Sequence, residues 1–147
     1  MKKLICAIMA AAMLLCLCAC GHSPADGATF SSVLSDKGLS VENLGSSGMD
    51  GVKDCYVAYN DDMSIVIFFY ITNSESDAQR AFNNAKAEFD SMGGSSTNVS
   101  SGSYARATRT SGEVFYIAAY SGATFMYGET SKDQASQMKD LFKALGY

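Results

Sequence analysis

"MSIVIFFYIT", residues 63–72, is the stretch that decides the fold. Its residues are mostly β-branched or aromatic, and a short apolar run bounded by turn-forming residues is typical of a buried strand. The stretch "DCYVAY", residues 54–59, predicts a second strand, and Asn60-Asp61-Asp62 between the two suits a hairpin turn. An antiparallel pair of strands is therefore the predicted centre of the domain.

Three helices are predicted around this pair. The middle helix begins at the capping-box pattern Ser76-Asp77-Ala78-Gln79 and ends at Gly93-Gly94. Its apolar residues recur at steps of three and four, which places them on one stripe: Ala78, Phe82, Ala85, Phe89 and Met92. A first helix is expected over 30–38 and a last one over 131–145, from the same kind of spacing.

The second half of the chain predicts further hairpins. Strands are expected at about 103–110, 113–120 and 123–129, because Ser111-Gly112 and Ser121-Gly122 suit tight turns between them. The stretch "GGSSTNVSSG", residues 93–102, is expected to be a flexible loop.

Together these elements predict an α+β domain. We expect a two-layer sandwich, in which an antiparallel sheet of four to five strands carries about three helices on one face, in the order αββαβββα. The predicted domain covers residues 28–147, a length that suits one domain.

The N-terminal end has the layout of an export signal. Lys2 and Lys3 are followed by an uncharged apolar stretch over 4–19, which is too short for a comfortable membrane span. A polar, turn-rich stretch follows. We therefore expect a cleaved signal peptide over 1–19 and a tether over 20–27.

Three of the five cysteines, Cys16, Cys18 and Cys20, stand two apart before His22, which at first resembles a metal site. However, Leu17-Cys18-Ala19-Cys20 resembles the lipobox of bacterial lipoproteins, with a small residue directly before the last cysteine. This resemblance implies cleavage before Cys20, a diacylglycerol on its sulfur, and attachment to the extracytoplasmic side of the cell membrane. Acylation would remove the thiol as a metal ligand, and Cys16 and Cys18 would leave with the signal peptide.

The domain also resembles small uncharacterised lipoproteins of Gram-positive, clostridia-like bacteria. The resemblance rests on the "KGL-x-V" stretch at 37–41, the acidic middle helix and the C-terminal "LFKALGY" at 141–147. These are core and capping positions, so the resemblance implies no particular activity.

The residues argue against several kinds of chemistry. His22 is the only histidine and lies in the expected tether, so the domain cannot build a Ser-His-Asp or Cys-His site. No phosphate-binding glycine motif is present, so we expect no cofactor. A zinc site needs several His or Cys ligands, and Cys55 and the distant His22 are too few, so we expect no metal. Asp61-Asp62 is interpreted as a solvated turn, as are Asp50 and Asp54, and Cys55 as a buried thiol.

Charge argues against nucleic acid as a partner. Without Lys2 and Lys3, nine basic residues stand against fifteen acidic ones, a net charge of −6. Nucleic-acid binding depends on clustered lysine and arginine residues.

Alternation along the strands predicts a tyrosine-rich face. Odd-numbered residues, with Ala105, Ala107 and Ala119, are expected to pack under the helices. The even-numbered set would then form a semi-exposed interaction face: Phe68, Tyr70, Tyr104, Arg106, Tyr116 and Tyr120. The alternative, that the first helix or the 93–102 stretch covers this face, stays open from sequence.

These observations favour a non-catalytic binding or interaction module of the cell envelope, anchored in the membrane through Cys20. The partner would be a protein, a peptide or a second copy of the chain. The alternative is a structural or accessory subunit of an envelope complex, and a thiol- or carboxylate-dependent enzyme is a weaker hypothesis.

Overall fold

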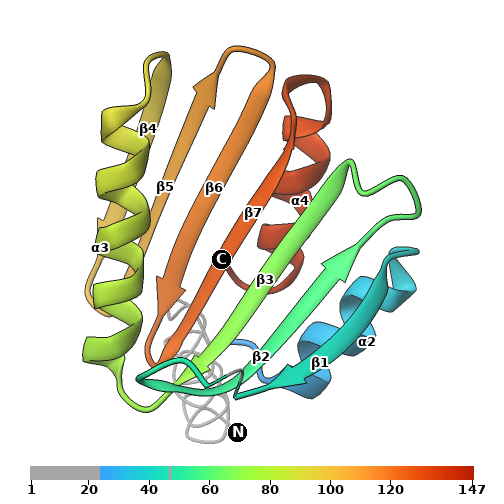
Figure 1. Cartoon of the computed structure of the whole chain (residues 1–147), viewed down its shortest axis with the longest axis vertical. Coiled ribbons are helices and arrows are strands. Elements are labelled where there is room, and N and C mark those ends of the chain that lie inside the picture. The colour runs from blue at the N-terminus through green and yellow to red at the C-terminus, as the bar shows by residue number, and fades with distance from the viewer. Residues whose placement is uncertain (1–23, 47) are drawn as a thin grey trace, which may run out of the picture.

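The computed structural model describes residues 24–46 and 48–147, shown in Figure 1. The expected signal peptide, Cys20 and His22 lie outside the described residues. The first half of the domain contains α2 (Gly27–Asp36), β1 (Ser40–Gly45), β2 (Val52–Tyr59), β3 (Ile65–Thr72) and α3 (Glu75–Ser91). The second half contains β4 (Ser95–Ser101), β5 (Tyr104–Ser111), β6 (Val114–Ser121), β7 (Thr124–Ser131), a 3₁₀ turn (Lys132–Gln134) and α4 (Ala135–Ala144).

All seven strands form one antiparallel sheet in the order β1-β2-β3-β7-β6-β5-β4. The α+β class is confirmed. The stretch at 63–72 forms β3, which pairs with β2 on one side and with β7 on the other. Because β7 is the last strand in the chain and β3 ends the first meander, their pairing joins the two halves of the domain.

The predicted sheet of four to five strands and the order αββαβββα are wrong. The observed order is αβββαββββα. The larger error concerns the stretch at 93–102, which contains β4, an edge strand paired with β5 from Ser95 opposite Thr110 to Ser101 opposite Tyr104. All seven residues of β4 are exposed, so it lacks the apolar alternation by which a strand is recognised.

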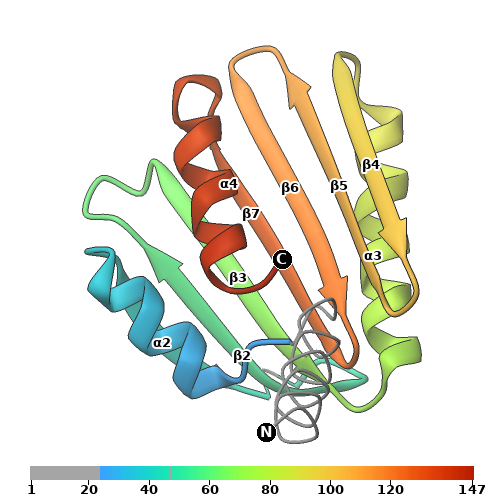
Figure 2. The same ribbon diagram turned by 180° about the vertical axis from the view of Figure 1, so that it is seen from behind.

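The two-layer arrangement is also wrong, because helices lie on both faces of the sheet. Helices α2 and α4 cover one face and α3 lies on the other, as the two opposite views show (Figures 1 and 2). The physical reason is clearest in β6, where Phe115, Ile117 and Ala119 belong to the core under α2 and α4, and Ala118 and Tyr120 to the core under α3. A strand that is apolar on both faces is typical of a sheet covered on both sides.

The larger core lies between the sheet and the pair α2 and α4. Phe30 of α2 stacks on Phe69 of β3 with ring centroids 4.8 Å apart, and both side chains are fully buried. Gly128 of β7 allows α4 to pack closely, since a Cβ there would lie 2.8 Å from Met138 Sδ and 2.9 Å from Phe142 Cε2. Among the described residues, no helix is long and apolar enough to cross a membrane.

The smaller core lies under α3. The helix begins two residues earlier than its predicted capping box, because Ser74 is the N-cap and accepts a hydrogen bond from the Asp77 amide. Its buried stripe of Ala78, Phe82, Ala85 and Phe89 packs on Ala105, Ala107, Ala118, Tyr120 and Phe125. Helix α3 therefore covers β5, β6 and part of β7.

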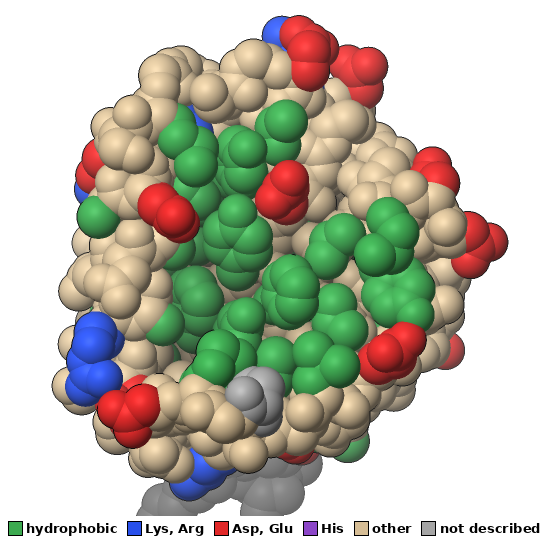
Figure 3. Space-filling model, in the orientation of Figure 1, with side chains coloured by type: hydrophobic (Ala, Val, Ile, Leu, Met, Phe, Trp, Pro, Cys, Tyr) green, Lys and Arg blue, Asp and Glu red, His purple; other side chains and the backbone are tan. Residues whose placement is uncertain are grey.

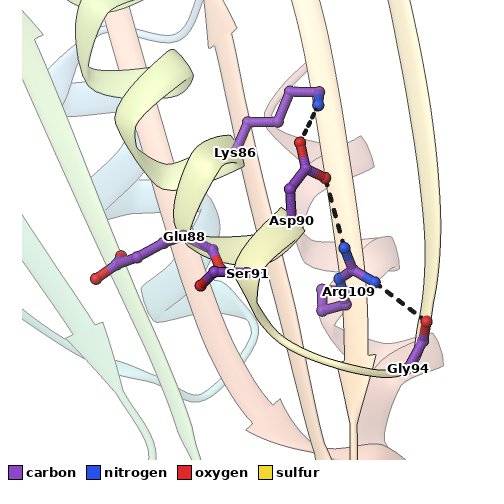
Figure 4. A network of polar contacts seen from close by, with 6 residues as sticks. All are labelled: Lys86, Glu88, Asp90, Ser91, Gly94 and Arg109. Carbon is purple, nitrogen blue, oxygen red and sulfur yellow. Dashed lines mark hydrogen bonds and ion pairs between the residues drawn. The ribbon is translucent and has the colours of Figure 1, made fainter.

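A polar network fixes the end of α3 to the sheet (Figure 4). Arg109 of β5 is buried, and its guanidinium donates to the Gly94 carbonyl oxygen at 3.1 Å and contacts Asp90 Oδ1 at 3.4 Å. Lys86 pairs with the other oxygen of Asp90. Gly94 is required where the chain turns into β4, because a Cβ there would lie 1.9 Å from the Thr110 carbonyl oxygen. These contacts join the C-terminal end of α3 to β5 and to the turn into β4.

Candidate interaction face

The side of the sheet that carries α3 is only partly covered. Figure 3 shows hydrophobic side chains gathered across the uncovered part. We call this surface the open face and define it by five half-buried residues: Val57 of β2, Val66, Phe68 and Tyr70 of β3, and Tyr127 of β7. Val57 stands opposite Phe68, and Phe68 opposite Tyr127, so three neighbouring strands contribute.

A groove of about 800 Å³ runs between α3 and the open face. Its floor is aromatic and includes Tyr70, Phe125 and Tyr127, while Ala81 and Ala85 of α3 form part of its wall. The rings of Tyr70 and Phe125 stack at 5.7 Å, and those of Phe68 and Tyr70 at 6.3 Å. The floor is therefore a row of stacked rings that crosses from β3 to β7.

A smaller depression of about 370 Å³ continues the open face toward its other end. Val66, Phe68 and Val114 contribute its apolar lining, and Tyr127 lines both depressions. The two depressions thus form one continuous apolar surface with Tyr127 in the middle.

Carboxylates surround this apolar surface. Asp50, Asp77 and Glu88 line the groove, and Glu113 and Glu129 line the second depression. Among the described residues that line the two depressions, Arg80 is the one basic residue, and it forms an ion pair with Asp77 at 3.0 Å. Glu88 extends from α3 on the side away from Asp90 and Arg109 (Figure 4). The rim therefore carries a net negative charge.

The phenols of the open face are neutral at neutral pH, since the ordinary pKa of tyrosine is about 10 and burial raises it. Burial raises the pKa of Tyr70 to about 12. The pKa of Tyr127 is raised further, first by burial and then by the charge of Glu129 beside it. At neutral pH both side chains are uncharged, so the charge of the site comes from the rim carboxylates and from Arg80.

Four of the six predicted face residues lie on the α3 side of the sheet. Phe68 and Tyr70 belong to the open face. Tyr116 and Tyr120 lie under α3, where Phe89 and Phe82 contact their rings at 5.8 Å and 5.4 Å. The cover of these two tyrosines is α3, rather than the first helix or the 93–102 stretch.

The other two predicted residues, Tyr104 and Arg106, lie on the opposite face of the sheet. Tyr104 is part of the larger core, and Arg106 stands opposite Ala119 of the same core.

The cause is turn geometry: in a two-residue hairpin, paired residues such as Tyr104 and Ser121 have numbers of opposite parity. Odd-numbered residues of β5 and β7 therefore share a face with even-numbered residues of β3 and β6. For the same reason Ala105 and Ala107 pack under α3, on the face opposite Ala119.

Other residues with candidate chemistry do not come together. Cys55 is a buried free thiol whose pKa is raised, mainly by burial and also by the charge of Asp54. Asp54 lies on the α2 side and accepts a hydrogen bond from the Tyr56 hydroxyl at 2.9 Å, whereas Asp50 lines the groove on the α3 side. Asp61 and Asp62 are exposed in the turn after β2. No cluster of three or more metal-ligating side chains exists within residues 24–46 and 48–147.

Comparison with known proteins adds information on the fold. No protein-family model and no curated protein sequence matches the chain. The structure is similar to a crystal structure from Thermotoga maritima described as a GTP-binding regulator, with a TM-score of 0.58 and 10% sequence identity. The match covers 85% of this chain and 93% of that chain. At such low identity the likeness concerns the fold alone.

Sequence reasoning missed Tyr127 and Glu88, and it interpreted Asp50 only as a solvated residue. The parity rule above would have placed Tyr127 on the same face as Phe68 and Tyr70, because Tyr127 follows two tight turns. Glu88 could have been predicted from a second stripe on α3 beside the buried one. Its residues recur at steps of three and four: Asp77, Ala81, Asn84 and Glu88. Asp50 precedes β2 in a glycine-rich stretch and carries no such signal.

Proposed function

We propose that this chain is a lipid-anchored binding module on the extracytoplasmic side of the cell membrane, and that it binds a polypeptide partner on the open face. The observation that carries the proposal is the continuous apolar surface of half-buried aromatic and aliphatic side chains beside α3. Large contiguous apolar patches on soluble domains typically mark interaction sites. Aromatic residues at the centre and charged residues at the rim are the usual anatomy of protein interfaces.

The anchor is supported by the sequence pattern that ends at Cys20. Pro24 lies against the turn between β6 and β7, where its Cγ would be 3.8 Å from a Cβ at Gly122. Four residues of chain from Cys20 to Pro24 reach at most about 14 Å. A lipid on Cys20 would therefore hold this end of the sheet close to the membrane surface. The groove begins at the same end of the sheet. The Thr72 amide donates to the Ala123 carbonyl in the turn between β6 and β7, and the neighbouring Asn73 amide donates to the carbonyl of Gly51, which lines the groove.

The nucleotide named for the Thermotoga structure is a poor fit to this groove. A nucleotide triphosphate is strongly anionic and is normally held by backbone amides and basic side chains. Here the groove presents Asp50, Asp77 and Glu88, with Arg80 already paired to Asp77. We therefore do not extend nucleotide binding to this chain.

Loss of the open face should abolish partner capture. The cross-strand pair Val57 and Phe68 is half-buried, so Val57→Ser with Phe68→Ser removes apolar contact area without opening the main core. With the membrane-anchored chain as bait, we expect these substitutions to reduce recovery of the partner at least tenfold, as the loss of central contacts in an interface typically does. Quantitative mass spectrometry of the captured proteins measures the change.

Val99→Ser is the matched control. Val99 is 45% exposed on the edge strand β4, opposite Arg106 and so on the other face of the sheet. It should leave recovery unchanged. Equal recovery with the wild-type chain and with the Val57→Ser, Phe68→Ser variant would show that the open face is not the binding surface. A monomeric wild-type chain that captures nothing would favour the accessory-subunit alternative.

A further inference from the structure

The open face has room for one helix. Helix α3 packs on β5, β6, part of β7 and the Tyr70 end of β3, and leaves β1, β2 and the rest of β3 without a helix on that side (Figure 1). Neighbouring strands lie about 4.8 Å apart, so three strands span roughly 14 Å. A helix with its side chains is about 10–12 Å across. A single helix beside α3 would therefore cover the half-buried aromatic side chains of the open face.

A strand is a poorer occupant of this surface. The backbone groups of β2, β3 and β7 already pair with each other in continuous ladders, so they cannot accept an added strand on their faces. An extended peptide laid across the face would leave its own backbone groups unpaired in an apolar environment, which is costly. A helix satisfies its backbone internally and presents only side chains, which is the helix-in-groove mode of recognition.

The charge of the rim selects the kind of helix. Five carboxylates line the two depressions, against Arg80 paired to Asp77. On β1, Glu42 also faces this side and accepts a hydrogen bond from the Tyr59 hydroxyl. A helix with lysine or arginine residues beside its apolar stripe would place positive charges against this rim.

The same charge argues against a second copy of the chain. Two open faces brought together would place carboxylates against carboxylates, and the chain from Cys20 onward has nine basic and fifteen acidic residues. Like charges at an interface oppose association.

We propose that the open face binds a basic amphipathic helix of its partner, which lies beside α3 with its apolar stripe on Phe68, Tyr70 and Tyr127 and its cationic side chains against Asp50 and Glu88. This inference rests on the proposed function and specifies the chemistry of the partner. Strands of eight residues are about 26 Å long, so a helix of about 18 residues matches the length of the face.

Two designed peptides of 18 residues test this inference. Both carry the same leucine stripe on an alanine-rich helix, and one has lysine where the other has glutamate. The full chain, purified in an uncharged detergent, is titrated into each fluorescently labelled peptide and binding is followed by anisotropy. The lysine peptide should bind at least tenfold more tightly than the glutamate peptide, and the difference should shrink in high salt.

Charge reversal on the chain locates the interaction. Asp50→Lys with Glu88→Lys should weaken binding of the lysine peptide about tenfold and strengthen binding of the glutamate peptide. The matched control is Asp133→Lys with Asp140→Lys, which makes the same change in net charge at exposed positions on the α4 side. This control should change both affinities less than twofold.

The inference is overturned if the two peptides bind equally, or if the control pair weakens binding as much as the groove pair does. It is also overturned if neither peptide binds. The proposed function survives that last result when Val57→Ser with Phe68→Ser still abolishes capture of the natural partner, and fails when capture is unaffected.

Discussion

Replacing Phe69 by alanine should lower the free energy of unfolding by about 3–5 kcal/mol, the usual cost of removing a fully buried phenylalanine. Phe69 has no exposed surface, stacks on Phe30 at 4.8 Å, and has Tyr56 at 6.2 Å on the same side of the sheet. Its loss would leave a cavity between β3 and α2. Urea denaturation of the purified chain, followed by circular dichroism, measures the change.

The neighbouring residue on the same strand provides the control. Phe68 points to the open face and is half-buried, so Phe68→Ala should cost about 1 kcal/mol. The pair of measurements thus tests which face of β3 is closed. Equal losses at the two positions would mean that the open face is packed as tightly as the core, and the interaction site would lose its basis.

Replacing Cys20 by alanine should abolish lipid attachment and normal cleavage, so that the protein accumulates as an unprocessed precursor. If Cys20 carries the diacylglycerol, the variant has no sulfur to acylate and its signal peptide is not removed in the usual way. Two or more acyl chains hold a protein stably on a bilayer, at about 0.8 kcal/mol per buried CH₂. Fractionation of cells and the mobility of the protein in denaturing gels measure retention and processing.

Cys18→Ala is the matched control for this change, because it lies in the same stretch and is expected to leave with the signal peptide. It should be processed and retained like the wild-type protein. Normal retention and cleavage of the Cys20→Ala variant would show that Cys20 is not the acylated residue, and the placement of the domain at the membrane would fall with it.

The strongest sequence signals were local. The run at 63–72 predicted β3 because an apolar, β-branched stretch of that length has few alternatives, and the glycine-containing turns predicted the hairpins of β5, β6 and β7. One further signal of the same kind was overlooked. Ser101-Gly102 stands ten residues before Ser111-Gly112, which itself precedes Ser121-Gly122 by ten. All three glycines have positive φ, at 57°, 59° and 52°, as the first position of a type II′ hairpin turn requires.

The errors arose where prediction needed long-range packing. No residue of β4 is buried, so only its turn could reveal it. The placement of α3 opposite α2 and α4 depends on how the two halves of the chain join at β3 and β7. The acidic groove exists because α3 packs beside that junction and brings Glu88 to the same surface as Asp50 and Tyr127. No local pattern encodes that arrangement.

Site-specific photo-crosslinking on the membrane can show whether the open face holds the partner. A photoreactive phenylalanine analogue is placed at position 68 on the open face or at position 99 on β4, in the full chain in intact cells, and the adducts are identified by mass spectrometry. We expect one dominant adduct from position 68, with a different polypeptide joined through a basic amphipathic helix, and none from position 99. Adducts of equal yield from both positions, or none from position 68, would contradict it.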